Sequence, residues 1–341
     1  MIPKRQVGPF AVNPIGLGCM SLAEIYGYKP DEADAERLLH RALDVGYDFL
    51  DTAAVYGHGL SETLIGRALK QRRSEFTLAS KCGFRADPGA APGARGIDGS
   101  PEAIRQTLDL SLQRLGFDHI DLYYLHRPDP QTPIEDSVGA LADAVKAGKI
   151  GSIGLSEVSA AQLRRAHAVH PIAALQTEYS LWTRNPEIAV LDACRELGTT
   201  FVAFSPVGRG FLTGTFPGQT LAPGDFRSMI PRFQEPNYSR NLTLLERFTE
   251  LAAEAGCSPA QLAIAWLLHR DPDLVTIPGT ARIAHLEENM AAGDVRLSAD
   301  QMTALDALLN ERTVAGERYS AAMQASVTTE QFAQAEGAAS A

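Results

Sequence analysis

Residues 32–51 read EADAERLLHRALDVGYDFLD, and they contain the repeating unit of the fold. The apolar positions in the first half of this stretch recur every three or four residues, as on one face of an amphipathic helix: Ala35, Leu38, Leu39 and Ala42. Asp31 or Asp34 can cap the start of the helix, and Gly46 is a typical helix end. Residues 47–51 then read as a short buried strand. The stretch therefore predicts a helix followed directly by a strand.

Strands and helices of this kind alternate eight times along the chain. The predicted strands are Pro14 to Cys19, Tyr47 to Asp51, Phe76 to Lys81, Ile120 to His126, Ile150 to Ser156, Ala173 to Thr177, Phe201 to Ser205 and Leu274 to Ile277. The helical stretches between them have start and stop signals: Pro101 to Leu115 follows Ser100 and ends at Gly116, and Asp136 to Ala147 ends at Gly148. Each helix fills the crossover between two parallel strands.

This pattern predicts an α/β fold of the (β/α)8 TIM barrel type. An open, doubly wound sheet of the same elements is the alternative. Residues 16–21, GLGCMS, supply only the first two glycines of a GxGxxG fingerprint and are not followed directly by a helix. Gly208 and Gly210 follow the seventh predicted strand rather than the first. Neither segment supports a Rossmann domain, so the barrel is favoured.

The ends of the chain and two long connections complete the prediction. Residues 7–12 predict a short N-terminal β-hairpin that can plug the bottom of the barrel. The connections 83–99 and 207–236 are too long for ordinary turns, and loops of that length are typical of lids over a site. We expect one barrel domain over residues 1–327 and a flexible C-terminal tail over residues 328–341.

The composition excludes several classes of protein. With 341 residues, of which 45% are hydrophobic and 21% charged, the chain can bury a large core and is neither disordered nor fibrous. The net charge of -10 argues against binding to nucleic acid or to anionic membranes. The start has no signal-peptide pattern, and no apolar run approaches the roughly 20 residues that span a bilayer, so we expect a cytoplasmic protein. Four widely spaced cysteines are expected to be reduced and mostly packed: Cys19, Cys82, Cys194 and Cys257.

Polar residues at three successive predicted strand ends suggest a site, because a β/α barrel carries its chemistry at the carboxyl ends of its strands. Asp51 and Tyr56 lie at and after the second strand, Lys81 ends the third, and His126 ends the fourth. Strand alternation puts Lys81 on the face of Ala79, toward the barrel, if small residues face inward. Each residue alone has an ordinary structural explanation. Their positions together favour a catalytic group.

These four residue types suit the reduction of a carbonyl group. A tyrosine hydroxyl, with an ordinary pKa of about 10, is a weak acid at neutral pH, and a nearby ammonium group lowers that pKa. Tyr56 could then donate a proton while Asp51 holds Lys81 in place. His126 could hydrogen-bond the substrate oxygen, so that hydride reaches carbon as the proton reaches oxygen.

The chain resembles the aldo-keto reductases from about Lys4 to about Leu309. The motifs that carry the resemblance are GLGCM (16–20), FLDTAAVYG (49–57), LASKCG (78–83), DLYYLHRPD (121–129), GLSEVS (154–159), LQTEYSLWTR (175–184), VAFSPVGRGFLTG (202–214) and IPGTARIAHLEEN (277–289). The resemblance implies a barrel that binds NADPH in extended form and a catalytic tetrad of Asp51, Tyr56, Lys81 and His126. Tyr56 would be the proton donor in reduction and the base in alcohol oxidation.

The resemblance also implies cofactor contacts. Ser156 and Gln176 would hydrogen-bond the nicotinamide carboxamide, and Phe204 would lie against the nicotinamide ring. Contacts with the pyrophosphate would come from Ser205, Pro206, Val207, Gly208 and Gly210. The 2′-phosphate and adenine would be bordered by Gly279, Thr280, Arg282, Glu288 and Asn289. Further cofactor-binding positions are Gly18, Met20 and Asp51.

The sequence departs from the family at a few of these positions. Ala281 and Thr215 stand where related sequences often carry lysine, and we expect Arg227 or Arg232 to compensate in favour of NADPH. Glu157 replaces the asparagine that many members place after the serine.

The substrate is less clearly encoded than the chemistry. The resemblance implies that substrate specificity comes from long loops over the C-terminal mouth of the barrel, at residues 25–30, 83–99, 207–236 and 311–323. We expect a small carbonyl compound or alcohol, with Tyr28 and Trp182 as candidate pocket aromatics, although lid or surface packing explains each of them about as well. A regulatory subunit like those of voltage-gated potassium channels, which share this tetrad, is the alternative function. A metal-dependent hydrolase is disfavoured, since the eight histidines are scattered and no metal site is expected. The sequence does not indicate an oligomeric state.

Overall fold

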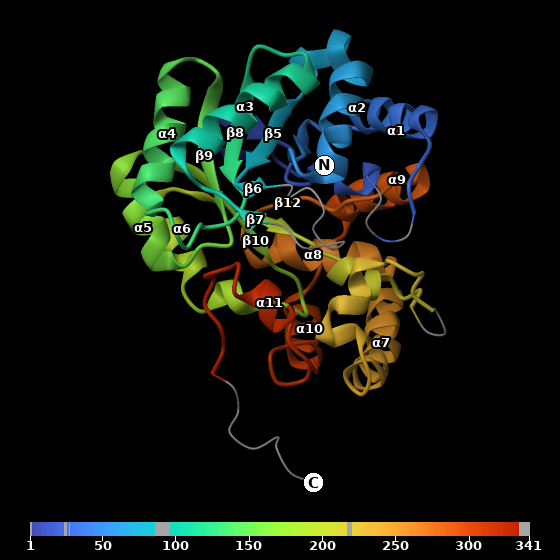
Figure 1. Ribbon diagram of the computed structural model, residues 1–341. Coiled ribbons are helices and arrows are strands. Elements are labelled where there is room, and N and C mark those ends of the chain that lie inside the picture. Colours follow the sequence, from blue (N-terminus) through green and yellow to red (C-terminus); the bar gives the residue numbers. More distant parts are fainter. Residues whose placement is uncertain (1, 24–25, 27, 86–95, 217–219, 334–341) are drawn as a thin grey trace.

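The computed structural model describes residues 2–23, 26, 28–85, 96–216 and 220–333. Its central sheet has eight strands, and every neighbouring pair is parallel (Figure 1). In chain order these strands are β3 (Leu17–Gly18), β4 (Phe49–Asp51), β5 (Thr77–Cys82), β8 (Ile120–Leu125), β9 (Ile150–Ser156), β10 (Ile172–Glu178), β11 (Thr200–Phe204) and β12 (Val275–Thr276). All eight predicted strands are confirmed, with ends that differ by a few residues.

The first and last strands of the sheet meet and close it. The Gly16 N–H donates to the Thr276 carbonyl at 2.8 Å, and the Thr276 N–H donates to the Pro14 carbonyl at 2.8 Å. A further parallel bridge joins Gly18 to Gly279. Because an open sheet would leave these backbone groups unpaired, the closed (β/α)8 barrel is confirmed over the open alternative.

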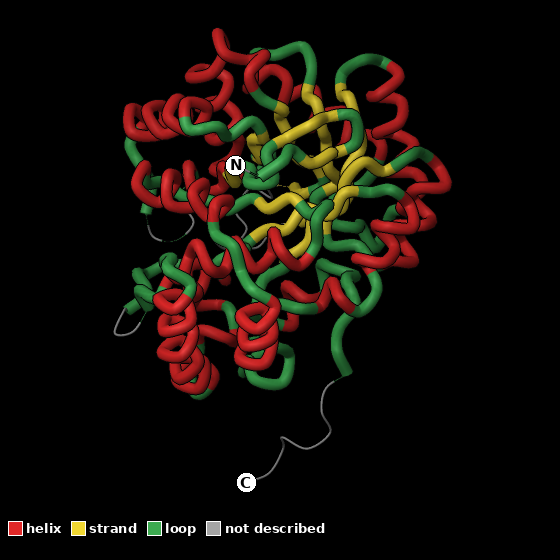
Figure 2. Tube along the Cα trace, turned by 180° about the vertical axis from the view of Figure 1, so that it is seen from behind, coloured by secondary structure: helices red, strands yellow, loops and turns green. Residues whose placement is uncertain are grey.

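Helices surround the barrel, as the view from behind shows (Figure 2). They are α1 (Glu32–Asp44), α2 (Leu60–Leu69), α3 (Pro101–Leu115), α4 (Ile134–Lys146), α5 (Ala160–Val169), α6 (Val190–Leu197), α7 (Asn237–Glu254), α8 (Pro259–Arg270), α9 (Ile283–Ala291), α10 (Ala299–Leu308) and α11 (Ala321–Gln324). In the part of the chain that the structure describes, no single helix is both long and apolar enough to cross a membrane. Only α7 and α8 taken together pass that test, and they are bent by 78°.

The start of α1 is settled by a side-chain cap. The Asp31 carboxylate accepts from the Asp34 N–H at 2.7 Å, so Asp31 rather than Asp34 is the N-cap. Gly46, with a φ of 103°, turns the chain from α1 toward β4. α3 has the predicted bounds, whereas α4 begins two residues earlier than predicted, at Ile134, because the apolar side chain of Ile134 is buried.

The strands separate two apolar layers. The inner layer fills the barrel and contains Val7, Val12, Phe49, Ala79, Leu122, Tyr124, Ala174, Val202, Val275 and Ile277. The outer layer, between the strands and the helices, includes Leu50, Leu78, Tyr123, Leu155 and Leu175. Alternation along β5 thus puts Ala79 inside and Leu78 outside, as predicted. The expectation that only small residues face inward is wrong, because a barrel of eight strands needs bulky side chains to fill it.

The N-terminal hairpin closes the bottom of the barrel. Strands β1 (Arg5–Val7) and β2 (Phe10–Val12) are antiparallel, and Val7 and Val12 belong to the inner layer. Gly8, at a φ of 57°, forms the turn, and a Cβ atom there would lie 2.8 Å from the Cβ of Ala173. The predicted plug is therefore present.

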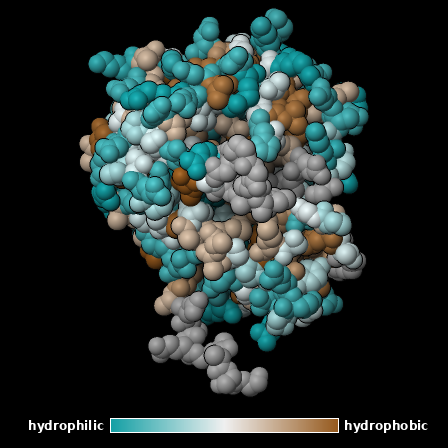
Figure 3. Space-filling model, in the orientation of Figure 1, coloured by the Kyte–Doolittle hydropathy of each residue, from teal (hydrophilic) through white to brown (hydrophobic). Residues whose placement is uncertain are grey.

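The long connections lie beyond the opposite end of the barrel. The first contains a small antiparallel pair, β6 (Phe84–Arg85) and β7 (Gly96–Ile97), and the second contains short helical turns at Gly208–Thr213, Phe226–Met229 and Pro231–Phe233. On the face that Figure 3 shows, strongly hydrophobic residues are scattered among hydrophilic ones rather than joined in one broad patch.

The prediction of a flexible tail from residue 328 is wrong for its first residues. The Thr328 N–H donates to the Glu157 carbonyl at 2.9 Å, and the Thr329 hydroxyl donates to the Glu157 carboxylate at 2.7 Å. The Glu330 carboxylate accepts from the Ala160 N–H at 2.9 Å. The small and polar residues of this segment suggested a tail, but hydrogen bonds to the buried Glu157 hold its first residues. Residues 334–341 lie outside the described part.

Candidate active site

The barrel brings the four predicted catalytic residues together at the carboxyl ends of β4, β5 and β8. Lys81 donates a hydrogen bond to the Asp51 carboxylate, and its Nζ lies 2.8 Å from the Thr52 carbonyl and 3.4 Å from the Tyr56 hydroxyl. The ring of His126 meets the ring of Tyr56 edge-on, with 5.8 Å between the ring centroids. Residues 75 positions apart in the sequence thus form one group around the Lys81 ammonium.

Lys81 is the centre of this group and is almost fully buried, with 1% of its surface exposed. Burial lowers the pKa of Lys81, but Asp51 and Tyr56 raise it more strongly, so the net pKa is above its ordinary value and the side chain stays an ammonium. A buried ammonium needs several oxygen acceptors, and Asp51, Thr52 and Tyr56 supply them.

Tyr56 has a raised pKa. Burial of the phenol raises it, and the Lys81 ammonium lowers it by a smaller amount. We expected the lysine to dominate, and the structure shows that burial does. The consequence is that the phenol carries its proton at neutral pH, which a proton donor must do, and that Lys81 offsets part of the cost of releasing it.

His126 forms the wall of the site beside Tyr56. Its backbone N–H donates to the Cys82 carbonyl at 2.8 Å, which fixes the end of β8 against β5. Phe84 packs edge-on against the His126 ring, with 4.7 Å between centroids. The imidazole is 7% exposed, so it borders a solvent-accessible space rather than lying in the core.

Two residues expected to hold the nicotinamide carboxamide are also linked to this group. Gln176, on β10, donates from Nε2 to the second oxygen of Asp51 at 2.7 Å. Ser156, at the end of β9, accepts from Arg127 Nη1 at 3.3 Å. Amide and hydroxyl groups therefore face the site from the strands opposite Tyr56.

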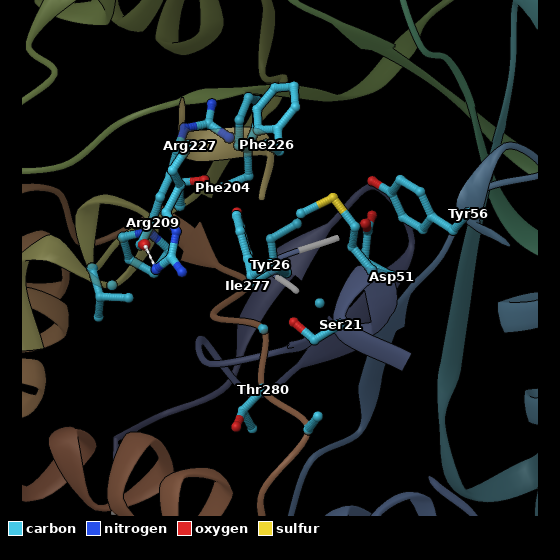
Figure 4. Close-up of a pocket in the computed structure, with 18 of the residues that line it drawn as sticks. Ser21, Tyr26, Asp51, Tyr56, Phe204, Arg209, Phe226, Arg227, Ile277 and Thr280 are labelled. Carbon is cyan, nitrogen blue, oxygen red and sulfur yellow. Dashed lines mark hydrogen bonds between the residues drawn. The ribbon is translucent and has the colours of Figure 1, made fainter. Parts of the chain in front are cut away.

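A cavity of about 1120 Å³ extends from this group. Tyr56 and Asp51 lie at one end of it, and Thr280 lies on another side (Figure 4). The predicted site residues that line it are Gly18, Met20, Tyr28, Asp51, Tyr56, His126, Ser156, Gln176, Phe204, Ser205, Pro206, Val207, Gly210, Gly279, Thr280, Arg282, Glu288 and Asn289. Lys81 lies behind Asp51 and Tyr56 and does not line the cavity.

Besides Lys81, two predicted site residues do not line the cavity. Trp182, expected as a pocket aromatic, is 3% exposed and stacks on Phe211 with 4.2 Å between centroids. Gly208, expected at the pyrophosphate, lies against Trp182, since a Cβ atom on it would be 3.0 Å from the indole nitrogen. Trp182 belongs to a cluster of aromatic rings with Phe211 and Phe233, and Gly208, in the loop after β11, packs against it.

The other end of the cavity is suited to an anion. Thr280 accepts from the Arg282 N–H at 3.0 Å, and α9 begins at the next residue, so its free N–H groups lie close by. Ala281 and Thr215 line the cavity too, and neither has a charge. Of the two arginines expected to compensate, Arg227 lines the cavity.

Arg232 does not contribute to that end of the cavity. It donates to the Trp182 carbonyl and, at 2.8 Å, to the Thr183 hydroxyl. Arg227 instead pairs with Asp225 and lies over the ring of Tyr26, 4.9 Å from its centroid.

The loop residues around the cavity have unusual backbone conformations. In the described ranges, four residues other than glycine have a positive φ near 55°: His58, Glu157, Ser205 and Arg209. Each follows a barrel strand at its carboxyl end, as does Tyr56. Such backbone costs about 1–3 kcal/mol per residue and is typical of functional sites.

Glu157 holds the C-terminal segment rather than facing the cavity. It is fully buried, and its two oxygens accept from Arg318 at 2.9 and 2.7 Å. It also accepts from the Thr329 hydroxyl and from the Glu178 N–H, at 2.7 and 3.0 Å. Although burial raises the pKa of Glu157, Arg318 lowers it by more, to about 2. The residue next to Ser156 therefore anchors the chain that forms another wall of the cavity.

The resemblance to the family places residues 311–323 in a loop over the barrel mouth, and part of this wall lies there. The sequence prediction did not name the individual residues of the wall or several other loop residues. Tyr319, Ala322, Met323 and Ser326 line the cavity from the C-terminal segment, and Arg127 lines it directly after His126. The position of Arg127 in a strand-end loop could have identified it. Nothing in residues 319–326 resembles a site motif.

Cys82 is a packing residue despite its position beside Lys81. Burial raises the pKa of its thiol to about 12, and its sulfur lies 3.5 Å from the Tyr124 carbonyl. Within the described ranges, no group of three or more His, Cys, Asp or Glu side chains could hold a metal ion.

Comparison with known proteins gives the family. The model of the aldo/keto reductase family matches residues 14–310. An aldo-keto reductase of Schizosaccharomyces pombe, whose name specifies NADP(+), is 45% identical over 93% of this chain and 94% of its own. An aldo-keto reductase of Strobilurus tenacellus is 41% identical over 93% and 95%. The chain belongs to the aldo-keto reductase family, and it is an oxidoreductase of that class.

Solved structures agree with this assignment. A glycerol dehydrogenase from Gluconobacter oxydans has a TM-score of 0.83 and 30% identity, and the match covers 92% of this chain and 96% of that one. The holo form of an aldo-keto reductase from Bacillus halodurans has a TM-score of 0.74 and 28% identity over 91% and 97%.

Proposed function

We propose that this protein reduces an aldehyde or ketone to an alcohol with NADPH, and that Tyr56 is the proton donor. The observation that carries the proposal is the contact of one buried ammonium, Lys81, with both the Asp51 carboxylate and the Tyr56 hydroxyl at the end of a large cavity. The reaction is reversible in chemical principle, and Tyr56 would be the base in the oxidation of an alcohol.

The cavity fits an extended dinucleotide. Its volume exceeds the 300–1,000 Å³ or so of ordinary small-molecule pockets. A hydroxyl and an amide, from Ser156 and Gln176, line it beside the catalytic group, and Arg282 with the first N–H groups of α9 lies beside Thr280, on another side. The cavity thus offers hydrogen-bonding groups for a carboxamide and cationic groups for a phosphate at different places.

Each residue of the catalytic group would have its own role in the reaction. Reduced nicotinamide, when bound, supplies the hydride for the carbonyl carbon. Tyr56 would donate its proton to the carbonyl oxygen, and Lys81 would stabilise the phenolate that remains. Asp51 holds Lys81 in position, and His126 would orient the carbonyl oxygen toward the Tyr56 hydroxyl.

The test is NADPH oxidation with a panel of aldehydes and ketones, followed by absorbance, for wild type and Tyr56→Phe. We expect the variant to bind NADPH with unchanged affinity and to lose about 10²–10⁴ in kcat. Tyr123→Phe is the matched control, because it removes a buried phenol hydroxyl that contacts the Ser111 hydroxyl at 3.5 Å, and neither residue lines the cavity.

Two outcomes would contradict the proposal. Full activity in Tyr56→Phe would exclude Tyr56 as the proton donor. Tight NADPH binding without turnover of any carbonyl compound would favour a regulatory subunit. A cytoplasmic location and the lack of a nucleic-acid partner stay predictions of the sequence.

A further inference from the structure

Arg127 is the charged residue nearest in sequence to the catalytic group, and no step of the proposed reaction uses it. It directly follows His126 at the end of β8 and lines the cavity with Tyr56 and His126. Its Nη1 donates to the His126 carbonyl at 2.7 Å and to the Ser156 hydroxyl at 3.3 Å. Both acceptors are uncharged.

The arginines around it have carboxylate partners. Arg209 pairs with Glu178 at 2.6 Å, and Arg318 pairs with Glu157 at 2.7 Å. Among the residues whose positions are described, no carboxylate lies within 4.0 Å of the Arg127 nitrogens, and the Arg127 Nε is buried without a hydrogen-bond acceptor. A guanidinium group has five N–H donors, so Arg127 keeps donors that these contacts do not use.

Glu157, a buried carboxylate that Arg127 affects, does not form an ion pair with it. The charge of Arg127 contributes to the lowered pKa of Glu157, so the two groups interact at a distance. However, the Glu157 oxygens already accept hydrogen bonds from Arg318, Thr329 and the Glu178 N–H. The positive charge of Arg127 is therefore directed at the cavity.

The position of Arg127 puts that charge in the same cavity as the reacting group. Arg127 lines the cavity together with Tyr56 and His126, and its charge acts to lower the pKa of Tyr56. Its Cζ also lies 5.6 Å from the centroid of the Phe84 ring, and Phe84 packs against His126. The guanidinium is thus held by a ring on one side and by two hydrogen bonds, which suits the recognition of a planar anion.

We propose that the substrate carries a carboxylate on the same molecule as the carbonyl, and that Arg127 binds this carboxylate. The substrate class is then the oxo acids, meaning aldehydes or ketones with a carboxylate group. This inference rests on the proposed function, because it specifies the substrate of the same site. The other cavity arginine without a carboxylate partner among the described residues, Arg282, lies beside Thr280, where the cofactor phosphate is expected.

The test compares matched pairs of substrates that differ only in charge. We would measure kcat/KM for 4-carboxybenzaldehyde and methyl 4-formylbenzoate, and for 4-oxobutanoate and its methyl ester, with wild type, Arg127→Lys and Arg127→Gln. A charge-assisted contact predicts that wild type prefers each acid by about tenfold or more, and that Arg127→Gln loses this preference while the ester rate changes by less than about threefold. Arg127→Lys should keep part of the preference, since it keeps the charge but not the planar fork.

Arg282→Gln is the matched control for the loss of one positive charge in the same cavity. It should raise the KM for NADPH and leave the ratio of kcat/KM between each acid and its ester unchanged. If the acid and the ester lose rate equally in Arg127→Gln, Arg127 acts only by positioning Ser156 and His126, and the inference is wrong. It is also wrong if wild type does not prefer the acids.

A binding measurement keeps the two proposals apart. Titration calorimetry of benzoate and of benzamide against the NADPH-saturated protein needs no turnover. We expect wild type to bind benzoate at least about tenfold more tightly than benzamide. Arg127→Gln should bind the two compounds with the same weak affinity. Equal binding of both compounds to wild type would overturn the carboxylate site. If wild type binds benzoate more tightly than benzamide but reduces none of the carbonyl compounds, only the proposed reaction is overturned.

Discussion

Two walls of the same cavity are built in different ways. The catalytic wall consists of residues at the ends of β4, β5 and β8, where the barrel backbone itself sets the positions of Asp51, Lys81 and His126. The C-terminal wall consists of residues 319–326, which no strand holds and which depend on buried contacts with Glu157. We propose that the first wall provides the chemistry and that the second shapes the space above it, so substitutions in the two walls should have different effects.

The largest effect on the catalytic wall should come from Lys81→Met. It removes the cation beside Tyr56 and leaves Asp51 buried without a charged partner, which typically costs 3–5 kcal/mol or so in unfolding free energy. We expect a loss of about 10²–10⁴ in kcat as well. Denaturant unfolding and NADPH oxidation would measure the two effects.

The double variant Asp51→Asn/Lys81→Met separates stability from chemistry. It removes both charges, so we expect much of the stability to return while kcat stays low. Recovery of kcat in the double variant would show that Lys81 serves only as the counter-ion of Asp51.

Glu157→Gln should act mainly on the C-terminal wall. The variant leaves Arg318 buried without its carboxylate, and we expect a loss of about 2–4 kcal/mol in unfolding free energy. The KM for the carbonyl substrate should rise several-fold with a smaller change in kcat. Faster hydrogen exchange in residues 319–330 would show that the wall has loosened.

The matched control for that variant is Glu135→Gln. Glu135 forms a similar two-bond pair with Arg165, at 2.8 Å each, but on the surface. Its removal should cost less than about 1 kcal/mol. Equal losses in the two variants would mean that burial of the Glu157 pair has no energetic importance.

The same pair predicts an acid dependence of stability. The pKa of Glu157 is about 2 in the folded protein against an ordinary 4.5, so folding favours the ionised form. Its contribution, about 3 kcal/mol, is complete above pH 4.5 or so and is lost as pH falls toward 2. Unfolding free energies between pH 2 and 6 should decline more steeply for wild type than for Glu157→Gln, and parallel curves would contradict this.

Arg282→Ala should have a smaller effect, far from both walls. We expect KM for NADPH to rise by about tenfold while KM for NADH changes little, because the arginine would contact only the 2′-phosphate. Parallel kinetics with the two cofactors would measure this. An equal rise for both would place Arg282 at another part of the cofactor.

Cys82→Ala should have the smallest effect. The thiol is buried with a pKa of about 12, so it is neither a base nor a nucleophile at neutral pH. We expect kcat to change less than about twofold, in line with a packing role. Rapid inactivation of native wild type by iodoacetamide that Cys82→Ala abolishes would contradict this assignment.

The catalytic wall was predictable because it is local to strand ends. Each of its residues follows a short apolar strand, and a parallel barrel gathers all such ends on one side. For the C-terminal wall, the family resemblance predicts only a loop over the barrel mouth at residues 311–323, and not which of its residues line the cavity. Met323 and Ser326 follow no strand, and their place depends on Glu157, which lies more than 160 positions earlier in the chain.

Two errors have the same origin. Trp182 and Gly208 both lie in segments that resemble family motifs, but they contact each other under the loop after β11 instead of the cavity. The sequence motifs correctly predicted that these segments follow barrel strands. The direction of a side chain within an irregular loop depends on what packs against it, here the stacked ring of Phe211.

By itself, the sequence determined the order of strands and helices, the barrel and the four residues around Lys81, since short-range periodicity and strand ends are local properties. Only the tertiary structure decided that burial governs the pKa of Tyr56, that Glu157 holds the C-terminal wall, and that Arg127 faces the cavity without a described carboxylate partner. These three depend on desolvation and on charges that come from distant parts of the chain, and such contacts exist only after folding.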